Sequence, residues 1–132
     1  MASVEWALIN NSLRLLSASF DFTVALWEQY EDGKTWGIES RLGEVTGNKN
    51  AYFGACLNSL GNEIVAYTFN GALHYWKQQE DKIWRSVPTV SGHFGPVSEI
   101  SIGPGFILSV SLDQTARIFS KIEERWAEIG RP

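Results

Sequence analysis

Few side chains in this sequence could do chemistry, and their spacing does not bring them together. There is one cysteine, Cys56, and there are two histidines, His74 and His93, whereas a zinc site usually needs four closely organised ligands. The segment Gly103–Gly105 lacks the lysine and the following helix of a phosphate-binding loop. Cys56 is interpreted as a small buried hydrophobe and His74 as a packed or surface residue. The sequence therefore predicts a protein that is not an enzyme and that holds no metal or cofactor.

The elements that carry these residues recur along the chain. A strand, a tight turn and a second strand ending in an aromatic residue appear three times, over Leu15–Trp27, Ile64–Trp76 and Ile107–Phe119. The turn residue is Asp21, then Asn70, then Asp113, at intervals of 49 and 43 residues. A period in the forties predicts a stacked repeat architecture.

A second series of tryptophans keeps nearly the same period. Each phrase is followed by a polar connection to another tryptophan: Glu28–Lys34, Lys77–Lys82 and Ser120–Arg125. Each of these tryptophans opens a further strand: Trp36–Leu42, Trp84–Val90 and Trp126–Ile129. Another strand precedes each phrase: Val4–Leu8, Tyr52–Leu57 and Val97–Ile102. The chain is thus expected to be three units of four short antiparallel strands, dividing at residues 1–46, 47–93 and 94–132.

Composition agrees with a single all-β domain of this kind. Aromatic residues make up 13% of the 132 residues and include six tryptophans, which suits large side chains between stacked sheets. A net charge of −4 does not mark the chain as a binder of nucleic acid or of anionic membranes. A single cysteine, no secretory signal and no apolar run of about 20 residues lead us to expect a cytoplasmic protein, also present in the nucleus, without membrane contact.

Four-stranded antiparallel sheets at this period resemble the blades of a β-propeller of the WD-repeat class. Propellers typically have about 4–8 blades, so three blades do not close a ring. We expect the chain to be part of a longer propeller, and the alternative is a ring made by two copies. An isolated piece would leave apolar faces open at both ends and would tend to associate.

The WD-repeat resemblance also implies a structural role for several polar residues. In that class a histidine, the turn aspartate, a strand hydroxyl and a tryptophan form a buried hydrogen-bond network that holds the blade. In the third unit His93, Asp113 and either Ser109 or Ser111 are the candidates, and Phe119 replaces the tryptophan. The corresponding residues of the other units are Asp21 with Trp27, and Asn70 with Trp76.

A closer resemblance rests on six segments that occur in order. They are Leu15–Asp21, Arg41–Val45, Asn70–Lys77, Ser91–Phe94, Leu108–Phe119 and Trp126–Pro132. Together they resemble the family of the second subunit of the Elongator complex, a scaffold of two WD-repeat propellers, over nearly the whole chain. The resemblance implies a non-catalytic scaffold that joins other subunits of a multiprotein complex, which modifies wobble uridines of transfer RNA through a different polypeptide.

Two other functions stay open at this point. One is an adaptor of another complex, and the other is a ligand-binding ring of two three-blade chains. Scattered basic residues could add a weak or indirect contact with transfer RNA, although we interpret them as ordinary surface charge on an acidic chain. They are Lys34, Arg41, Lys49, Lys77, Lys82, Arg85, Lys121, Arg125 and Arg131. The sequence does not predict which surface binds partners.

Overall fold

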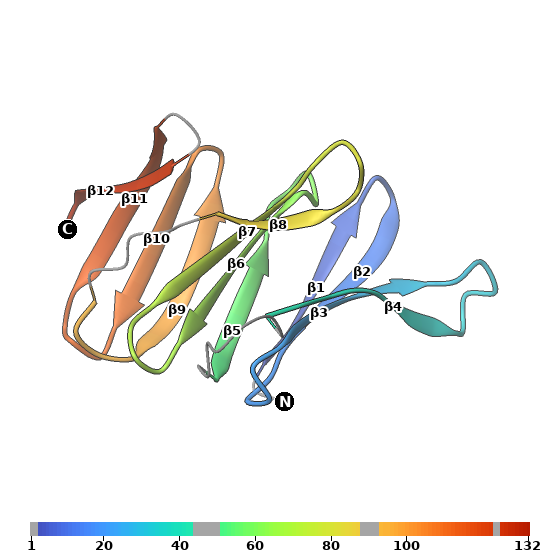
Figure 1. The fold of residues 1–132 in the computed structure, drawn as a ribbon, viewed down its shortest axis with the longest axis horizontal. Helices are drawn as coiled ribbons and strands as arrows, with labels where there is room; N and C mark the ends of the chain where they lie inside the picture. The colour runs from blue at the N-terminus through green and yellow to red at the C-terminus, as the bar shows by residue number, and fades with distance from the viewer. Residues whose placement is uncertain (1–2, 44–50, 88–92, 123–124) are drawn as a thin grey trace.

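Three four-stranded antiparallel sheets stand side by side in chain order (Figure 1). The computed structural model describes residues 3–43, 51–87, 93–122 and 125–132, and it contains no helix in these ranges. The first sheet is β1 Ser3–Ile9, β2 Ser12–Ala18, β3 Val24–Gln29 and β4 Trp36–Leu42. The second is β5 Tyr52–Leu57, β6 Glu63–Thr68, β7 Leu73–Gln78 and β8 Trp84–Val87. The third is β9 Val97–Gly103, β10 Phe106–Ser111, β11 Ala116–Ile122 and β12 Arg125–Gly130. The predicted all-β fold of four-stranded units is confirmed.

The turns repeat in backbone conformation as well as in sequence. β1 and β2 are joined by Asn10 and Asn11 alone, with φ angles of 49° and 61°, which matches the twist of a two-residue hairpin. At the β2–β3, β6–β7 and β10–β11 turns the left-handed residue follows the Asp or Asn: Phe22 at 73°, Gly71 at 90° and Gln114 at 69°. The three copies therefore share one turn geometry even where side chains differ.

The core lies in two layers, one on each side of the second sheet. Side chains of a strand alternate between its faces, so Ile64 and Ala66 pack toward the first sheet, while Val65 packs toward the third. The first layer is Leu16, Ala18, Val24, Leu26, Leu42, Tyr52, Ala55, Ile64, Ala66 and Trp76. The second is Val65, Leu73, Tyr75, Val97, Ile100, Ile107, Phe119 and Trp126. Each fully buried Val, Leu, Ile or Phe side chain contributes about 1.5–3 kcal/mol to stability, so the layers hold the sheets together.

The first and third sheets each leave one apolar face open. Trp6 on β1 is 61% exposed, and Leu108 and Val110 on β10 are about one third exposed. By position in the repeat, Leu15 and Trp27 of the first sheet correspond to Ile64 and Trp76 of the second. Leu108 and Val110 likewise correspond to Leu16 and Ala18, which are buried between the first two sheets. The open face of the first sheet thus resembles the face that the second sheet packs against the first. The open face of the third sheet resembles the face that the first sheet packs against the second.

An ion pair joins the second and third sheets beside the core. Lys121 Nζ on β11 donates to Glu63 Oε1 on β6 at 2.7 Å, and the buried Tyr75 hydroxyl donates to the same oxygen at 2.5 Å. Burial raises the pKa of Glu63, but these two hydrogen bonds and the charges of Lys121 and Lys77 together leave the pKa below its usual value. The carboxylate is therefore held charged between the two sheets.

The prediction that each second strand ends at its aromatic residue was wrong. β3 continues past Trp27, β7 past Trp76 and β11 past Phe119, because the backbone goes on pairing with the next strand. The last pairs are Gln29 with Trp36, Gln78 with Trp84 and Ile122 with Arg125. The polar connections are correspondingly shorter than predicted. Residues 88–90 of the predicted strand Trp84–Val90 and the division at 46/47 lie outside the described residues.

Candidate interaction surface

In the third sheet His93 connects the turn aspartate to a strand serine. Its Nδ1 lies 3.0 Å from Asp113 Oδ2 and its Nε2 lies 2.6 Å from Ser109 Oγ. With the proton on Nδ1, the ring donates to Asp113 and accepts the hydrogen bond of the Ser109 hydroxyl. Thr115 Oγ1 and the Phe94 backbone N–H also donate to Asp113. These bonds, that of Thr115 first, hold the pKa of Asp113 well below its usual range.

A serine, a histidine and an aspartate in this order could activate a nucleophile, but burial prevents it here. Ser109 and the His93 side chain are both 0% exposed, so no substrate can reach the hydroxyl. The chain of bonds joins the segment before β9 to the β10–β11 hairpin. This arrangement is suited to holding the sheet rather than to acyl transfer.

The two other residues proposed for this network make different contacts, and Ser111 reaches it only by accepting a hydrogen bond from the Asp113 backbone N–H. Ser111 Oγ donates to the carbonyl oxygens of Gly95 and Pro96, which fixes the entry to β9. Phe119 is buried in the second core layer, where its ring replaces the expected indole with packing alone. Of the two serines considered, the structure places Ser109 against His93.

The first sheet keeps a different part of the same pattern. Trp27 Nε1 donates to Ser17 Oγ at 3.0 Å, and Ser17 stands at the repeat position of Ser109. Asp21 accepts hydrogen bonds from the backbone and side chain of Thr23. The Thr23 hydroxyl is the main cause of the lowered pKa of Asp21.

In the second sheet aromatic packing replaces most of the polar contacts. Asn70 Oδ1 accepts from Thr68 Oγ1 and from the backbone N–H of Ala72, so it closes the turn as an aspartate would. Trp76 stacks on His74 with ring centroids 6.0 Å apart, and Tyr52 meets both rings edge-on. Burial lowers the pKa of His74, which agrees with its interpretation as a packed residue.

Sequence reasoning did not find Arg117, the most deeply buried charge of the described residues. The Arg117 side chain is only 1% exposed, and its guanidinium lies 3.8 Å from Asp113 Oδ2 and 3.4 Å from Glu128 Oε2. Its position on β11, two residues after Thr115, could have indicated that it shares a face with the turn network. Arg117 therefore extends that network to the outer strand β12.

Cys56 lies on β5, and its thiol donates to the Ile100 carbonyl oxygen of β9. Burial, with smaller contributions from Glu5 and Glu99, raises the pKa of the Cys56 thiol to about 12. Within the ranges described, no three His, Cys, Asp or Glu side chains gather as metal ligands would.

An aromatic row, defined as the exposed Phe20 and Phe69 and the half-buried Phe53 between them, crosses the first two sheets at the strand ends that carry the Asp and Asn turns. The Phe20 and Phe53 rings are 5.2 Å apart, and the Phe53 and Phe69 rings are 5.5 Å apart. Phe20 is 55% and Phe69 61% exposed, although contiguous apolar surface normally avoids water. Both immediately precede the turn residue, and Leu112, at the same position in the third repeat, is 70% exposed. This row is the candidate interaction surface.

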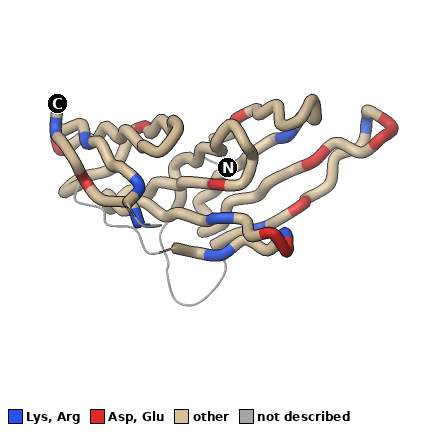
Figure 2. Tube along the Cα trace, turned by 90° about the horizontal axis from the view of Figure 1, so that it is seen from above, with Lys and Arg blue, Asp and Glu red and all other residues tan. Residues whose placement is uncertain are grey.

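In the described ranges the basic residues are mixed with acidic ones along the chain (Figure 2). Several of the basic residues named above are paired with acids: Arg85 with Asp81, Lys121 with Glu63 and Arg131 with Glu128. Lys49 lies outside the described residues.

Comparison with known proteins agrees with the sheets and their order. The C-terminal WD40 domain of Sif2 superposes with a TM-score of 0.72 at 16% identity, covering 98% of this chain and 36% of that domain chain. No family model matches the sequence. In the described ranges there is no helix long and apolar enough to cross a membrane.

Sequence relatives are more specific. Elongator complex protein 2 of Danio rerio is 39% identical over 138 residues, which cover 98% of this chain. The Homo sapiens and Arabidopsis thaliana proteins of the same name are 37% and 30% identical. The resemblance to the Elongator complex protein 2 family is confirmed. The chain spans 17% of the length of the Danio rerio protein and 16% of the Homo sapiens protein. The chain is therefore similar to one segment of Elongator complex protein 2.

Proposed function

We propose that this chain is part of a non-catalytic WD-repeat scaffold of an Elongator-type complex. In this role it holds partner subunits together while another polypeptide modifies wobble uridines of transfer RNA. We place it in the cytoplasm and also in the nucleus. Its similarity to Elongator complex protein 2 supports this assignment, and the aromatic row is the single observation that carries a docking function.

The proposed mechanism is geometric. Phe20 and Phe69 project from tight turns of well-packed sheets, so little side-chain or loop freedom is lost when a partner covers them. Exposed aromatic side chains that become fully buried supply most of the binding energy in many interfaces. Phe53 between them makes the surface continuous across two sheets.

Further blades would complete the ring at the two open apolar faces. The open face of the first sheet has the same repeat positions as the face of the second sheet that packs against the first. A blade of the same kind can therefore cover each end. A second copy of the chain would use the same contacts head to tail and is the alternative.

The test is co-purification of the tagged full-length protein from cells, followed by mass spectrometry. We expect the double variant Phe20→Ser, Phe69→Ser to recover at least tenfold less of the partner subunits than the wild type. Ile83→Ser is the matched control, because Ile83 is also exposed but lies in the β7–β8 turn, at the other end of the strands from Phe69. Equal recovery by the double variant would reject the aromatic row as a docking surface. Recovery of an unrelated set of partners would instead favour a general WD-repeat adaptor.

A further inference from the structure

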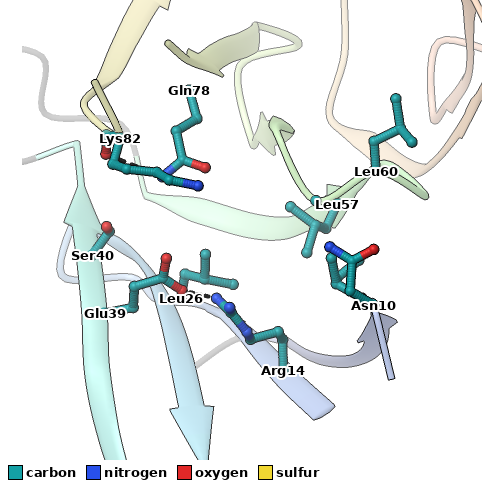
Figure 3. Close-up of a pocket in the computed structure, with 11 residues that line it drawn as sticks. Asn10, Arg14, Leu26, Glu39, Ser40, Leu57, Leu60, Gln78 and Lys82 are labelled. Carbon is teal, nitrogen blue, oxygen red and sulfur yellow. Dashed lines mark hydrogen bonds and ion pairs between the residues drawn. The ribbon is translucent and has the colours of Figure 1, made fainter. Parts of the chain in front are cut away.

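A polar pocket of about 470 Å³ lies between the first and second sheets, at the strand ends opposite the aromatic row (Figure 3). The β1–β2, β5–β6 and β7–β8 turns surround its mouth. Figure 3 shows Arg14 and Glu39 on the wall formed by the first sheet, with Gln78 and Lys82 on the facing wall. Leu57 and Leu60 give it an apolar side. Its size is within the range of ligand-binding clefts.

Arg14 offers more hydrogen-bond donors than the pocket wall uses. Its Nη1 forms an ion pair with Glu39 Oε2, and both side chains are about one quarter exposed. Its Nε is buried and finds no hydrogen-bond acceptor among the residues that the structure describes. The guanidinium lines the pocket, so its positive charge would stabilise an acceptor oxygen that enters there.

Lys82 supplies a second cation on the facing wall. Its backbone is held in the β7–β8 turn, where its N–H donates to the Gln79 carbonyl and its own carbonyl accepts from Gln78 Nε2. Its ammonium has no ion-pair partner in the described part of the chain. Two cations and the single carboxylate of Glu39 therefore leave the pocket with one positive charge in excess.

We propose that this pocket binds an acidic side chain, Asp or Glu, of a partner polypeptide. The carboxylate lies between Arg14 and Lys82, and aliphatic residues beside it pack on Leu57 and Leu60, of which Leu60 is 74% exposed. A bound carboxylate would leave the pocket neutral, whereas a phosphate dianion would leave it with one uncompensated negative charge. The proposal extends the scaffold function to a second surface.

Binding of synthetic peptides to the purified full-length protein tests this site. The probe is a fluorescein-labelled heptapeptide with a central Glu between two leucines, and the comparison peptides carry Gln or phosphoserine instead. We expect the Glu peptide to bind at least tenfold more tightly than either, with an affinity that falls as salt is raised. Equal binding of the Gln peptide, tighter binding of the phosphoserine peptide or no binding of any peptide would overturn the proposal.

Variants locate the binding to the pocket. Lys82→Gln and Arg14→Gln should each weaken the Glu peptide about tenfold, because each removes one cation that faces the carboxylate. Lys34→Gln is the control, since Lys34 is an exposed lysine of the β3–β4 turn outside the pocket. Lys82 is exposed and can be replaced without disturbing the core, so an unaltered affinity of Lys82→Gln also overturns the proposal. Because the assay uses isolated protein, its outcome is independent of whether the aromatic row recruits subunits.

Discussion

Trp27 and Phe119 occupy the same position in the first and third repeats, but only Trp27 makes a hydrogen bond there. Its indole donates to Ser17, whereas Ser109, the counterpart of Ser17, is bonded to His93. Each repeat thus keeps a different part of one polar pattern, and packing of the buried rings supplies the rest. The contribution of these contacts can be measured by comparing matched substitutions.

Trp27→Phe should lower the free energy of unfolding by about 1 kcal/mol more than Trp84→Phe. Both changes remove a similar volume from a partly buried site. However, Trp27 Nε1 has a partner in Ser17, while Trp84 Nε1 is buried with no hydrogen-bond partner in the described ranges. Urea denaturation of the full-length protein, followed by tryptophan fluorescence and circular dichroism, measures the difference. Equal losses would show that the Ser17 bond contributes nothing.

In the Asp113→Asn variant, the free energy of unfolding should fall less steeply with decreasing pH than in the wild type. Hydrogen bonds from Thr115, Phe94 and His93 depress the pKa of Asp113 in the folded protein below its ordinary value of 3.8. A depressed pKa contributes stability above the unfolded value, and this stability is lost as the pH falls toward the folded pKa. The advantage of wild type over Asp113→Asn should therefore shrink as the pH falls from about 5 to 3.

Urea denaturation at pH 7, 5, 4 and 3 tests this, with Glu80→Gln as the control for an exposed acid in a turn. The assignment would be contradicted if the difference between wild type and Asp113→Asn stayed constant over this range.

Gly71→Ala should be more destabilising than Gly33→Ala. Both glycines have positive φ, 90° and 68°, so each substitution strains the backbone by roughly 1–2 kcal/mol. A Cβ on Gly71 would also lie 2.5 Å from the backbone oxygen of His93, whereas one on Gly33 meets nothing within 4 Å. We expect a further penalty of about 1–3 kcal/mol at Gly71, measured by thermal or urea unfolding. Similar penalties would indicate that the segment at His93 moves aside.

Cys56 should resist alkylation in the folded protein. The Cys56 thiol, with its pKa raised to about 12, provides almost no thiolate at pH 8, and the thiolate is the reactive form. Iodoacetamide labelling followed by peptide mapping should show Cys56 modified at least tenfold more slowly in native buffer than in urea. Rapid native labelling would mean that β5 separates from β9 readily.

Part of the fold could be predicted because its signals are local. Alternation of apolar residues, paired turn residues such as Asn10 and Asn11, and the recurring tryptophans each depend on a few neighbours in sequence. Strand ends were mistaken because backbone pairing beyond Trp27 or Phe119 depends on the partner strand. The choice between Ser109 and Ser111 likewise required the position of His93, 16 residues before Ser109.

The candidate surfaces had only a partial signal in the sequence. Phe20 and Phe69 each precede a turn residue, but Phe53 joins them from a different strand of the second sheet. The charge of Arg117 could be read directly, but its burial depends on Glu128 of a neighbouring strand. The pocket at Arg14 exists only because the first two sheets meet.

By itself, the sequence determined the number of repeats, the four-strand pattern of each and the resemblance to a scaffold family, because these follow from residue type and spacing along the chain. The tertiary structure alone decided which side chains share a surface, which faces stay open and where charge is buried. The physical reason is that burial and electrostatic environment depend on contacts between sheets, which join residues far apart in sequence, whereas residue type and spacing describe only neighbours along the chain.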